Sequence, residues 1–283
     1  MNASTHVSTG PAAVVNAGRG ALWFDAVTGA APLLAGYPAS VLVADALLAG
    51  RPARYIAVVP NPANRFPRAR SGEVGLIEGW QLARAVQDLI DLDQANALKT
   101  PIVCVIDVAS QAYGRREEGY GIHQALAGAA GAYAGARLAG HPVIGLIVGK
   151  AMSGAFLAHG YQANRLIAFD DQKVMVHAMG KESAARITLR SVEAMETLAS
   201  TVAPMAYDIA SYASLGLLWQ TLALQQPDRP SGSDIEQVRA SLTAALNDIL
   251  SDESGDLRSR LGAHNRQASS RVRALLRAQW QSA

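Results

Sequence analysis

The chain has 283 residues, of which 50% are hydrophobic and 17% are charged. Its 25 basic and 23 acidic residues leave a net charge of +2, a balance that argues against a nucleic-acid-binding protein. The sequence has no run of about 18 apolar residues, so no membrane span is predicted. The single cysteine, Cys104, excludes a disulfide within the chain and fits a reducing cytoplasm. The low charge fraction indicates that a partner subunit covers part of the surface.

The first third of the chain predicts an arm followed by a helix, a strand and a second helix. Residues 1–20 have the composition of a flexible or docking arm and lack the basic and apolar regions of a signal peptide. A helix is expected around Ser40–Leu48, and the β-branched run Arg54–Val59 is expected to be a strand. Glu78–Asp93 repeats apolar residues at helical spacing and predicts an amphipathic helix.

The middle of the chain predicts two consecutive strand–loop–helix units. The apolar run Lys99–Val108 reads as a strand buried on both faces, with Cys104 as a core residue. A polar loop (109–121) and an Ala/Gly-rich helix (122–139) follow. Each helical glycine costs about 1 kcal/mol relative to alanine, so close packing of this helix is expected.

The second unit, Gly140–Gly154, is the most informative part of the chain. A strand (Val143–Val148) is expected to end at a turn marked by Gly149, and a short helix is expected to begin near Ser153. Backbone N–H groups at the start of a helix lack intrahelical partners, and with the helix dipole they favour an oxyanion. Open α/β sheets usually bind ligands at the carboxyl ends of their strands. The pattern therefore predicts a site that stabilises negative charge on an acyl oxygen.

The last third predicts further strands and a helical end. Arg165–Phe169 and Lys173–Met179 are expected to be strands, and about 191–216 is expected to be helical. Pro227 opens the best linker, and a capping box over Ser233–Glu236 is expected to start another helix. The tail from about residue 257 is basic, which is typical of a solvated helix face and less often of an acidic-partner site. We divide the chain into the arm (1–20), a main domain (21–226) and a C-terminal helical extension (227–283).

Several motifs carry a resemblance over roughly residues 54–220. Asp107–Gly121, with the pair Glu117–Glu118, and Val143–Gly180 resemble the α-type carboxyltransferase half of biotin-dependent acyl-CoA carboxylases, a branch of the crotonase superfamily. The chain departs from that pattern at Ala109-Ser110, at Ala155 and at His177–Gly180. It is more similar to the γ subunits of biotin-independent malonate decarboxylase. The shared motifs are Trp-Phe-Asp-Ala-x-Thr-Gly, Ser-Gln-Ala-Tyr-Gly-Arg-Arg-Glu-Glu-Gly, Gly-His-Pro-Val-Ile-Gly-Leu and Gly-Lys-x-Met-Ser-Gly-Ala-Phe.

The resemblance implies an α/β fold of the crotonase (ClpP/crotonase) type, built from repeated ββα units, with a helical C-terminal extension. It implies a β-type partner subunit of the same fold, with the active site between the two, together with an acyl carrier protein and a carrier-transferase subunit. The implied reaction is decarboxylation of malonyl thioester on the carrier protein to acetyl thioester. The carrier would bear a prosthetic group derived from dephospho-CoA, and this chain itself would need no cofactor and no metal. We expect the complex to be cytoplasmic.

The candidate site residues come from the two loops at the strand ends. The candidate catalytic groups are the backbone donors of the turn and of the first loop, together with possible proton sources: Ser153, Gly154, Ser110, Gln111, Ala112, Tyr113 and His177. The candidate substrate-binding residues are Lys150, Met152 and Tyr120, of which Tyr120 is also a possible proton source. The proton could instead come from the partner subunit. Glu117 and Glu118 are expected to cap the helix that follows them.

Two other functions fit the same residues. The chain could be an α-type carboxyltransferase subunit of a biotin-dependent acyl-CoA carboxylase, or a non-catalytic scaffold that keeps the fold to bind its partner. In the carboxylases the α-type half faces biotin and the β-type half holds the CoA thioester. By analogy, this chain could hold the carboxylate end of the substrate rather than its thioester oxygen.

Overall fold

Two parallel apolar strands, β3 (Ile102–Val108) and β4 (Val143–Met152), form the centre of the fold. The structure is a computed structural model and describes residues 18–281. Within this range the sheet has seven strands in the order β1-β2-β3-β4-β5-β7, with β6 paired to the end of β4. Only β1 runs antiparallel to its neighbour, so the sheet is mixed. The remaining strands are β1 (Val41–Leu48), β2 (Arg51–Val58), β5 (Arg165–Phe169), β6 (Met175–His177) and β7 (Gln220–Leu222).

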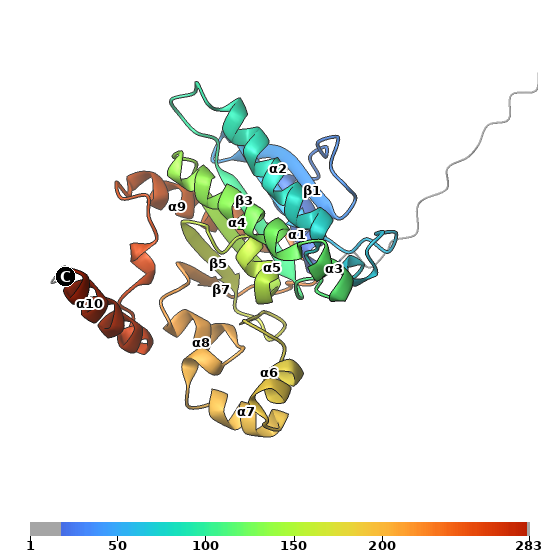
Figure 1. Cartoon of the computed structure of the whole chain (residues 1–283). Helices are drawn as coiled ribbons and strands as arrows, with labels where there is room; N and C mark the ends of the chain where they lie inside the picture. Colours follow the sequence, from blue (N-terminus) through green and yellow to red (C-terminus); the bar gives the residue numbers. More distant parts are fainter. Residues whose placement is uncertain (1–17, 282–283) are drawn as a thin grey trace, which may run out of the picture.

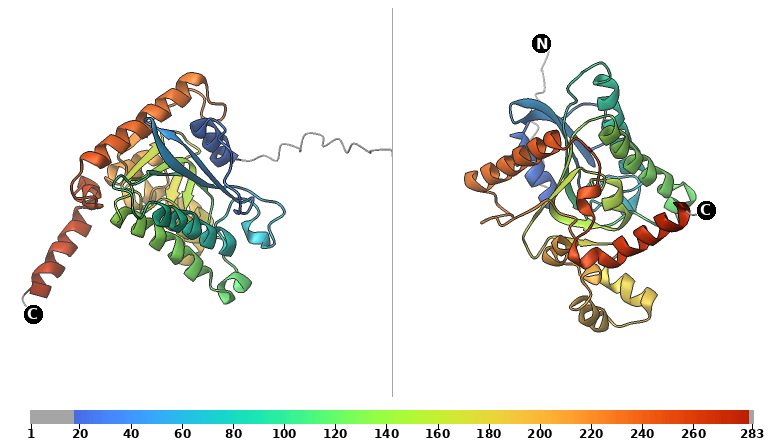
Figure 2. Two further views of the ribbon diagram at one scale, coloured as in Figure 1. Left: turned by 90° about the horizontal axis from the view of Figure 1, so that it is seen from above. Right: turned by 90° about the vertical axis from the view of Figure 1, so that its left-hand side faces the viewer.

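Helices cover both faces of the sheet (Figure 1). On one face α2 (Leu76–Leu92) packs against α4 (Ile122–Leu138), and on the other α1 (Gly18–Thr28) and α9 (Gly232–Ser251) lie over the strands (Figure 2). Shorter helices gather at the carboxyl ends of the strands, and α10 projects from the body of the molecule. These are α3 (Arg115–Gly119), α5 (Ser153–Ala158), α6 (Lys181–Thr188), α7 (Val192–Ala199) and α8 (Ile209–Ser214), with α10 at Gln267–Gln281. Single 3₁₀ turns are η1 (Pro67–Ala69), η2 (Ala203–Met205), η3 (Arg258–Arg260) and η4 (His264–Arg266).

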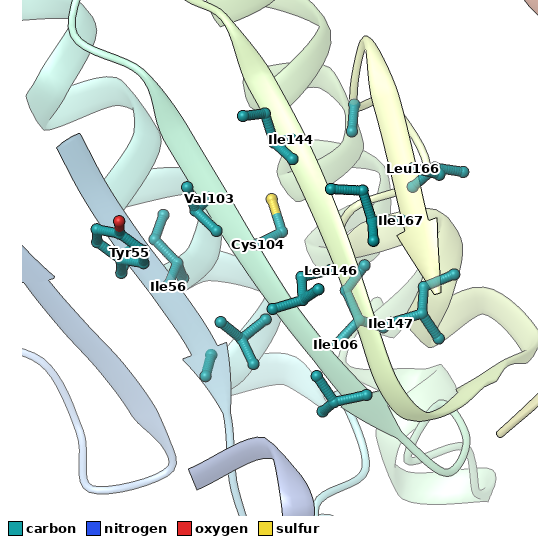
Figure 3. Packing of buried hydrophobic residues seen from close by; sticks show 14 of the residues in the cluster. Tyr55, Ile56, Val103, Cys104, Ile106, Ile144, Leu146, Ile147, Leu166 and Ile167 are labelled. Carbon is teal, nitrogen blue, oxygen red and sulfur yellow. The ribbon is translucent and has the colours of Figure 1, made fainter. Parts of the chain in front are cut away.

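The core lies between β3, β4 and their neighbours, where apolar side chains from adjacent strands interdigitate (Figure 3). Cys104 is fully buried there, and burial raises the pKa of its thiol to about 12. A thiol held in this neutral form is a poor nucleophile, so the prediction of a core role is confirmed. Side chains of α9, including Val238 and Leu242, belong to the same core.

Most predicted elements are confirmed, with some corrections. The strand expected over Lys173–Met179 is shorter (β6), and the helical region expected over about 191–216 is divided into α7, η2 and α8. Ser40–Leu48 is a strand (β1) and not a helix, because it pairs along its whole length with β2. β4 continues past Gly149 to Met152, so that glycine lies in a strand and not in a turn. The capping box of α9 uses Ser231 and Asp234 instead of Ser233–Glu236. Of the predicted arm, residues 1–17 lie outside the described residues, and Gly18–Gly20 form the first turn of α1.

The expected close packing of the Ala/Gly-rich helix α4 is confirmed at one of its three glycines. A Cβ atom on Gly128 would lie 2.9 Å from the indole of Trp80 on α2. From the other side, a Cβ atom on Gly79 would lie 2.8 Å from the backbone of Ala125. Gly131 and Gly135 have no such neighbour within 4 Å. Glycine is therefore needed where α2 and α4 touch but not along the rest of α4.

Asp107, near the end of β3, ties three segments together beside the strand ends. Its carboxylate accepts hydrogen bonds from the backbone N–H of Gly20 (3.2 Å) and of Lys150 (3.0 Å). A Cβ atom on Gly149 would lie 2.2 Å from the same carboxylate. Gly149 is therefore required for the close approach of Asp107 to β4, and this contact fixes the part of β4 that leads into α5.

Candidate functional site

The junction between β4 and α5 is a sharp turn from strand to helix. β4 pairs with β3 as far as Ala151 and with β6 through Met152, which lies opposite His177. Ser153 then adopts a φ of 62°, a left-handed conformation that is rare for residues with a side chain. Such strain is a frequent feature of functional sites. No side chain caps α5, so the first N–H groups of this six-residue helix have no side-chain acceptor.

A cavity of about 320 Å³ opens beside this junction. Ser153, Gly154 and His177 all line it, and the pairing of Met152 with His177 explains why they meet. The other lining residues are aliphatic or aromatic: Phe156, Leu157, Tyr161, Val176, Ala178, Ala203, Pro204, Ala206, Tyr212, Leu215 and Leu217. Among residues 18–281, no Asp, Glu, Lys or Arg lines the cavity, so a charged group that enters it leaves water without gaining an ion pair from this part of the chain.

His177 is held from two sides. Its Nδ1 atom lies 3.0 Å from the carbonyl oxygen and 3.2 Å from the amide nitrogen of Met179. Its ring stacks on Tyr207, with centroids 3.9 Å apart and planes inclined by 15°. Burial lowers the pKa of the imidazole below its ordinary value of 6.5, because a charged ring loses hydration there. No hydrogen-bond partner is recorded for Nε2 among the described residues, which leaves that atom for a ligand.

One side chain of the loop after β3, that of Gln111, lies against Gly154 beside the cavity. A Cβ atom on Gly154 would lie 2.0 Å from Oε1 of Gln111, so the amide group of Gln111 packs directly against Gly154. The backbone of this loop is engaged elsewhere. The N–H of Ala112 donates to the oxygen of Val74 (2.9 Å), and the N–H of Val74 donates to the oxygen of Ser110 (3.0 Å).

These contacts correct the expectation for Ala112, whose amide is not a free oxyanion donor, and leave the expectation for the amides of Ser110 and Gln111 a prediction. The N–H of Tyr113 is also engaged, because it donates to the oxygen of Gln111 (2.9 Å). Ala112 itself is buried in a small cluster with Phe66. The first loop therefore brings the side chain of Gln111 to the junction, and its backbone holds the loop in place.

The remaining sequence candidates lie away from the cavity. The side chain of Lys150 is exposed, while its amide is bound by Asp107. Met152 is buried between the strands. Tyr113 is half-exposed, and Tyr120 packs against Phe66 beside a separate hollow lined by Arg65 and Trp80. Glu117 and Glu118 lie in α3, and the N-terminus of α4, the helix that they were expected to cap, has no side-chain cap among the described residues, so that prediction is wrong.

A larger cavity of about 520 Å³ lies nearby, between α7, α8 and the loop after β5. Its lining includes the carboxylates of Asp170, Asp171, Glu196 and Asp208. Its lining also includes Lys181, but four carboxylates against one ammonium group make this cavity a poorer receptor for an anion than the uncharged one. In residues 18–281, no three His, Cys, Asp or Glu side chains are grouped as metal ligands, and none of the helices is long and apolar enough to span a membrane.

Three residues near the site were given no role from the sequence. Tyr207 and Tyr212 lie in a region predicted only as helical, and their contacts with β6 and α5 are long-range. Asp107 is a charged residue near the end of an apolar run, and this was the sequence signal that it has a special role. Its hydrogen bonds to α1 and β4 depend on folding and could not be predicted.

The comparisons with known proteins decide the family. A family model described as malonate decarboxylase gamma subunit matches residues 69–280, which is most of the chain. The chain belongs to the malonate decarboxylase gamma-subunit family. As a member of that family it is a malonate decarboxylase subunit, and the resemblance seen in the sequence is confirmed.

Solved structures of gamma-subunit relatives agree over nearly the whole chain. A chain of a Pseudomonas malonate decarboxylase hetero-tetramer in complex with coenzyme A is 64% identical, with a TM-score of 0.89. A chain of a Pseudomonas malonate decarboxylase hetero-dimer is 60% identical, with a TM-score of 0.85. Both alignments cover 93% of this chain and 99% of the relative.

More distant relatives share part of the chain or only the fold. The malonyl-S-ACP:biotin-protein carboxyltransferase MADD of Malonomonas rubra is 36% identical over 140 residues, which is 48% of each protein. The chain thus spans about half the length of this curated relative. Transcarboxylase 12S is 20% identical, with a TM-score of 0.61 over 83% of this chain and 42% of that chain. The predicted crotonase-like α/β fold is confirmed.

Proposed function

We propose that the chain acts in the decarboxylation of malonyl thioester carried on an acyl carrier protein, with acetyl thioester and CO₂ as products. The bond between C2 and the carboxylate carbon breaks, and its electron pair forms an enolate as CO₂ leaves. A proton added to C2 then gives the acetyl group. The observation that carries the proposal is that Ser153, Gly154 and His177 line one cavity without charged lining residues. The names of the relatives support malonate and malonyl-S-ACP as the substrate class.

The cavity suits both demands of this reaction. Backbone N–H groups at Ser153 and Gly154 would stabilise the developing enolate oxygen, and one such donor is typically worth about 10²–10³ in rate. An uncharged, apolar lining gives the malonyl carboxylate no ion pair, so loss of charge as CO₂ is favoured there. Because the same cavity offers amides and an apolar wall, this chain could receive either end of the malonyl group.

His177 is the proton donor that the geometry favours. It lines the cavity, whereas Tyr113 and Tyr120 do not. Proton transfer from a positioned side chain typically contributes about 10²–10⁴ in rate. The imidazolium form would donate its Nε2 proton to C2, and the neutral ring would then take a proton from solvent.

We further propose that the working form is a hetero-oligomer with a β-type subunit, an acyl carrier protein and a carrier-transferase subunit. The relatives were crystallised as a hetero-dimer and hetero-tetramers. Helix α10 supports the need for a partner, because its apolar residues Val272, Leu275, Leu276 and Trp280 are exposed. The substrate would be carried by a prosthetic group derived from dephospho-CoA. We place the complex in the cytoplasm, where the free thiol of Cys104 stays reduced.

Expressed without partners, the chain should self-associate and lack decarboxylase activity. The exposed apolar face of α10 and the proposed interface would otherwise remain in contact with water. Light scattering measures the association of the purified chain. The comparison is between the unchanged chain and a variant that carries Leu276→Ser and Trp280→Ser. A monodisperse monomer with the full activity of the complex would refute this expectation.

Activity of the assembled complex should survive both avidin and EDTA. The proposed step needs only electrostatic stabilisation of an enolate, so neither biotin nor a metal enters it. The measurement is CO₂ release from malonyl carrier protein after each treatment, with a known biotin-dependent carboxylase as the positive control for avidin. Loss of activity with EDTA that added metal restores would mean that the amides of Ser153 and Gly154 are not the main source of stabilisation.

The runner-up is an α-type carboxyltransferase subunit, and the similarity to a malonyl-S-ACP:biotin-protein carboxyltransferase favours it. In that case the carboxylate would pass to biotin rather than leave as free CO₂. Inhibition by avidin decides for this alternative. A scaffold role would be indicated if substitutions at Gly154 and His177 left the activity of the complex unchanged.

A further inference from the structure

Tyr207 is placed against His177 by the backbone and not by side-chain packing alone. The N–H of Val176 in β6 donates to the carbonyl oxygen of Tyr207 (3.1 Å). The neighbouring residues Met175 and Asp208 form an antiparallel bridge. This pairing sets the segment of Tyr207 beside the last strand before the cavity, and the two rings then stack at 3.9 Å.

A cation also lies near the ring of Tyr207. The ammonium group of Lys181 lies 5.6 Å from the centroid of the phenol ring and 2.7 Å from the carboxylate of Glu196. The ring of Tyr207 therefore contacts both the imidazole of His177, which lines the cavity, and the Lys181 cation. Contacts with an aromatic face and with a cation restrict how far the Tyr207 ring can turn.

The hydroxyl of Tyr207 plays no part in this arrangement. Tyr207 is 92% buried, and its hydroxyl has no hydrogen-bond partner in the described part of the chain. A buried hydroxyl without a partner is a cost to stability. The contribution of Tyr207 is therefore its aromatic face, which stacks on His177.

We propose that Tyr207 is a positioning residue: its ring fixes the imidazole of His177 so that Nε2 faces the substrate cavity. Two contacts define the ring orientation, the stack on Tyr207 and the hydrogen bonding between Nδ1 and the backbone of Met179. Without the stack, the imidazole can tilt about its contact with Met179, and Nε2 is no longer held in one direction toward the cavity. The proposal rests on the role of His177 in the proposed function.

The test is a double-mutant cycle in the assembled complex. Tyr207→Ala should lower kcat about ten-fold on the acid plateau with a small change in KM, because a misplaced catalytic group costs rate. Tyr207→Phe, which keeps the ring, should retain nearly normal kcat. Tyr207→Leu keeps an apolar side chain that fills part of the space without the stack, and it should match the alanine variant. In a His177→Gln background, all three substitutions should have no further effect on kcat.

The pH profile gives a second readout with a definite sign. Imidazolium is the donor, so activity falls as pH rises through the pKa of His177, which lies below 6.5. Tyr207→Ala admits water, so the pKa should rise towards 6.5 and the descending limb should move to higher pH. The groups around the ring are Tyr161 and Tyr212 in the cavity, with Lys181, Glu182 and Glu196 behind Tyr207. Because Lys181 is paired with Glu196, their net field on the ring is small.

Two outcomes would overturn the proposal. One is a Tyr207→Phe variant as slow as Tyr207→Ala, which would assign the effect to the hydroxyl. The other is an equal loss from Tyr207→Ala when His177 is already glutamine. A histidine ¹³C NMR titration of the chain distinguishes failure of the Tyr207 proposal from failure of the proposed function. If His177→Gln is fully active, His177 is not the proton donor. A shift of the His177 pKa in Tyr207→Ala would still show that the Tyr207 ring controls the environment of the imidazole.

Discussion

Gly154→Val should lower the turnover of the assembled complex at least about 10²-fold while the complex still forms, in line with loss of one oxyanion donor. A Cβ atom at this position would lie 2.0 Å from Oε1 of Gln111 and 3.3 Å from the side chain of Leu126. The valine methyl groups would then cover the amide that we propose as the oxyanion donor and push the Gln111 side chain aside. Steady-state kinetics measures the loss, and co-purification with the partner measures assembly.

A paired variant separates the amide from the clash. Gln111→Ala removes the side chain that meets the new Cβ atom, so the Gly154→Val/Gln111→Ala variant relieves the crowding. If Gly154→Val acts by blocking access to the backbone amide, the turnover of the double variant should stay low. Recovery of turnover in the double variant, or near-normal turnover in Gly154→Val itself, would show that this turn has only a structural role.

The parts of the fold that the sequence predicts well are those determined locally. β3 and β5 are continuous apolar runs of the length expected for buried strands, and α4 and α2 show clear helical limits. β1 was mispredicted because Leu and Ala are good helix formers, while its conformation is set by pairing with β2. Pairing within the hairpin formed by β1 and β2 overrides the helix preference of these residues in this case.

The same division applies to the candidate site. Ser153, Gly154 and His177 could be placed together because they lie at or just after the ends of recognisable strands, and the ends of neighbouring parallel strands meet at one edge. The engagement of the Ala112 amide by Val74 could not be predicted, since it joins loops that are far apart in the sequence. Tyr207 lies 30 residues after His177, and only the folded backbone brings the two rings together.

Glycine at position 149 is required, but not for the reason that the sequence suggested. The sequence suggested a turn, whereas the structure shows a strand residue whose missing side chain makes room for a carboxylate. The new methyl group in Gly149→Ala would lie 2.2 Å from Oδ1 and 2.5 Å from Cγ of Asp107. Asp107 would have to move, and its hydrogen bonds to the amides of Gly20 and Lys150 would be lost or stretched.

We therefore expect Gly149→Ala to destabilise the chain by about 3 kcal/mol, within the range for overpacking combined with loss of hydrogen bonds to a charged group. For a chain of this size, that loss corresponds to a fall in Tm of roughly 6–12 °C. Thermal unfolding of the complex, followed by calorimetry, measures it. Turnover should fall as well, since Lys150 lies three residues before Ser153 in the segment that Asp107 fixes.

Two controls make the Gly149→Ala result specific to Asp107. Gly131→Ala places a methyl group on an exposed part of α4 where nothing lies within 4 Å, so it should leave Tm unchanged or raise it, as expected for replacement of a helical glycine. Asp107→Ala combined with Gly149→Ala removes the atoms that collide, so the double variant should be less destabilised than the sum of the two single variants. If the two losses simply add, the carboxylate contact is not the reason for glycine at position 149.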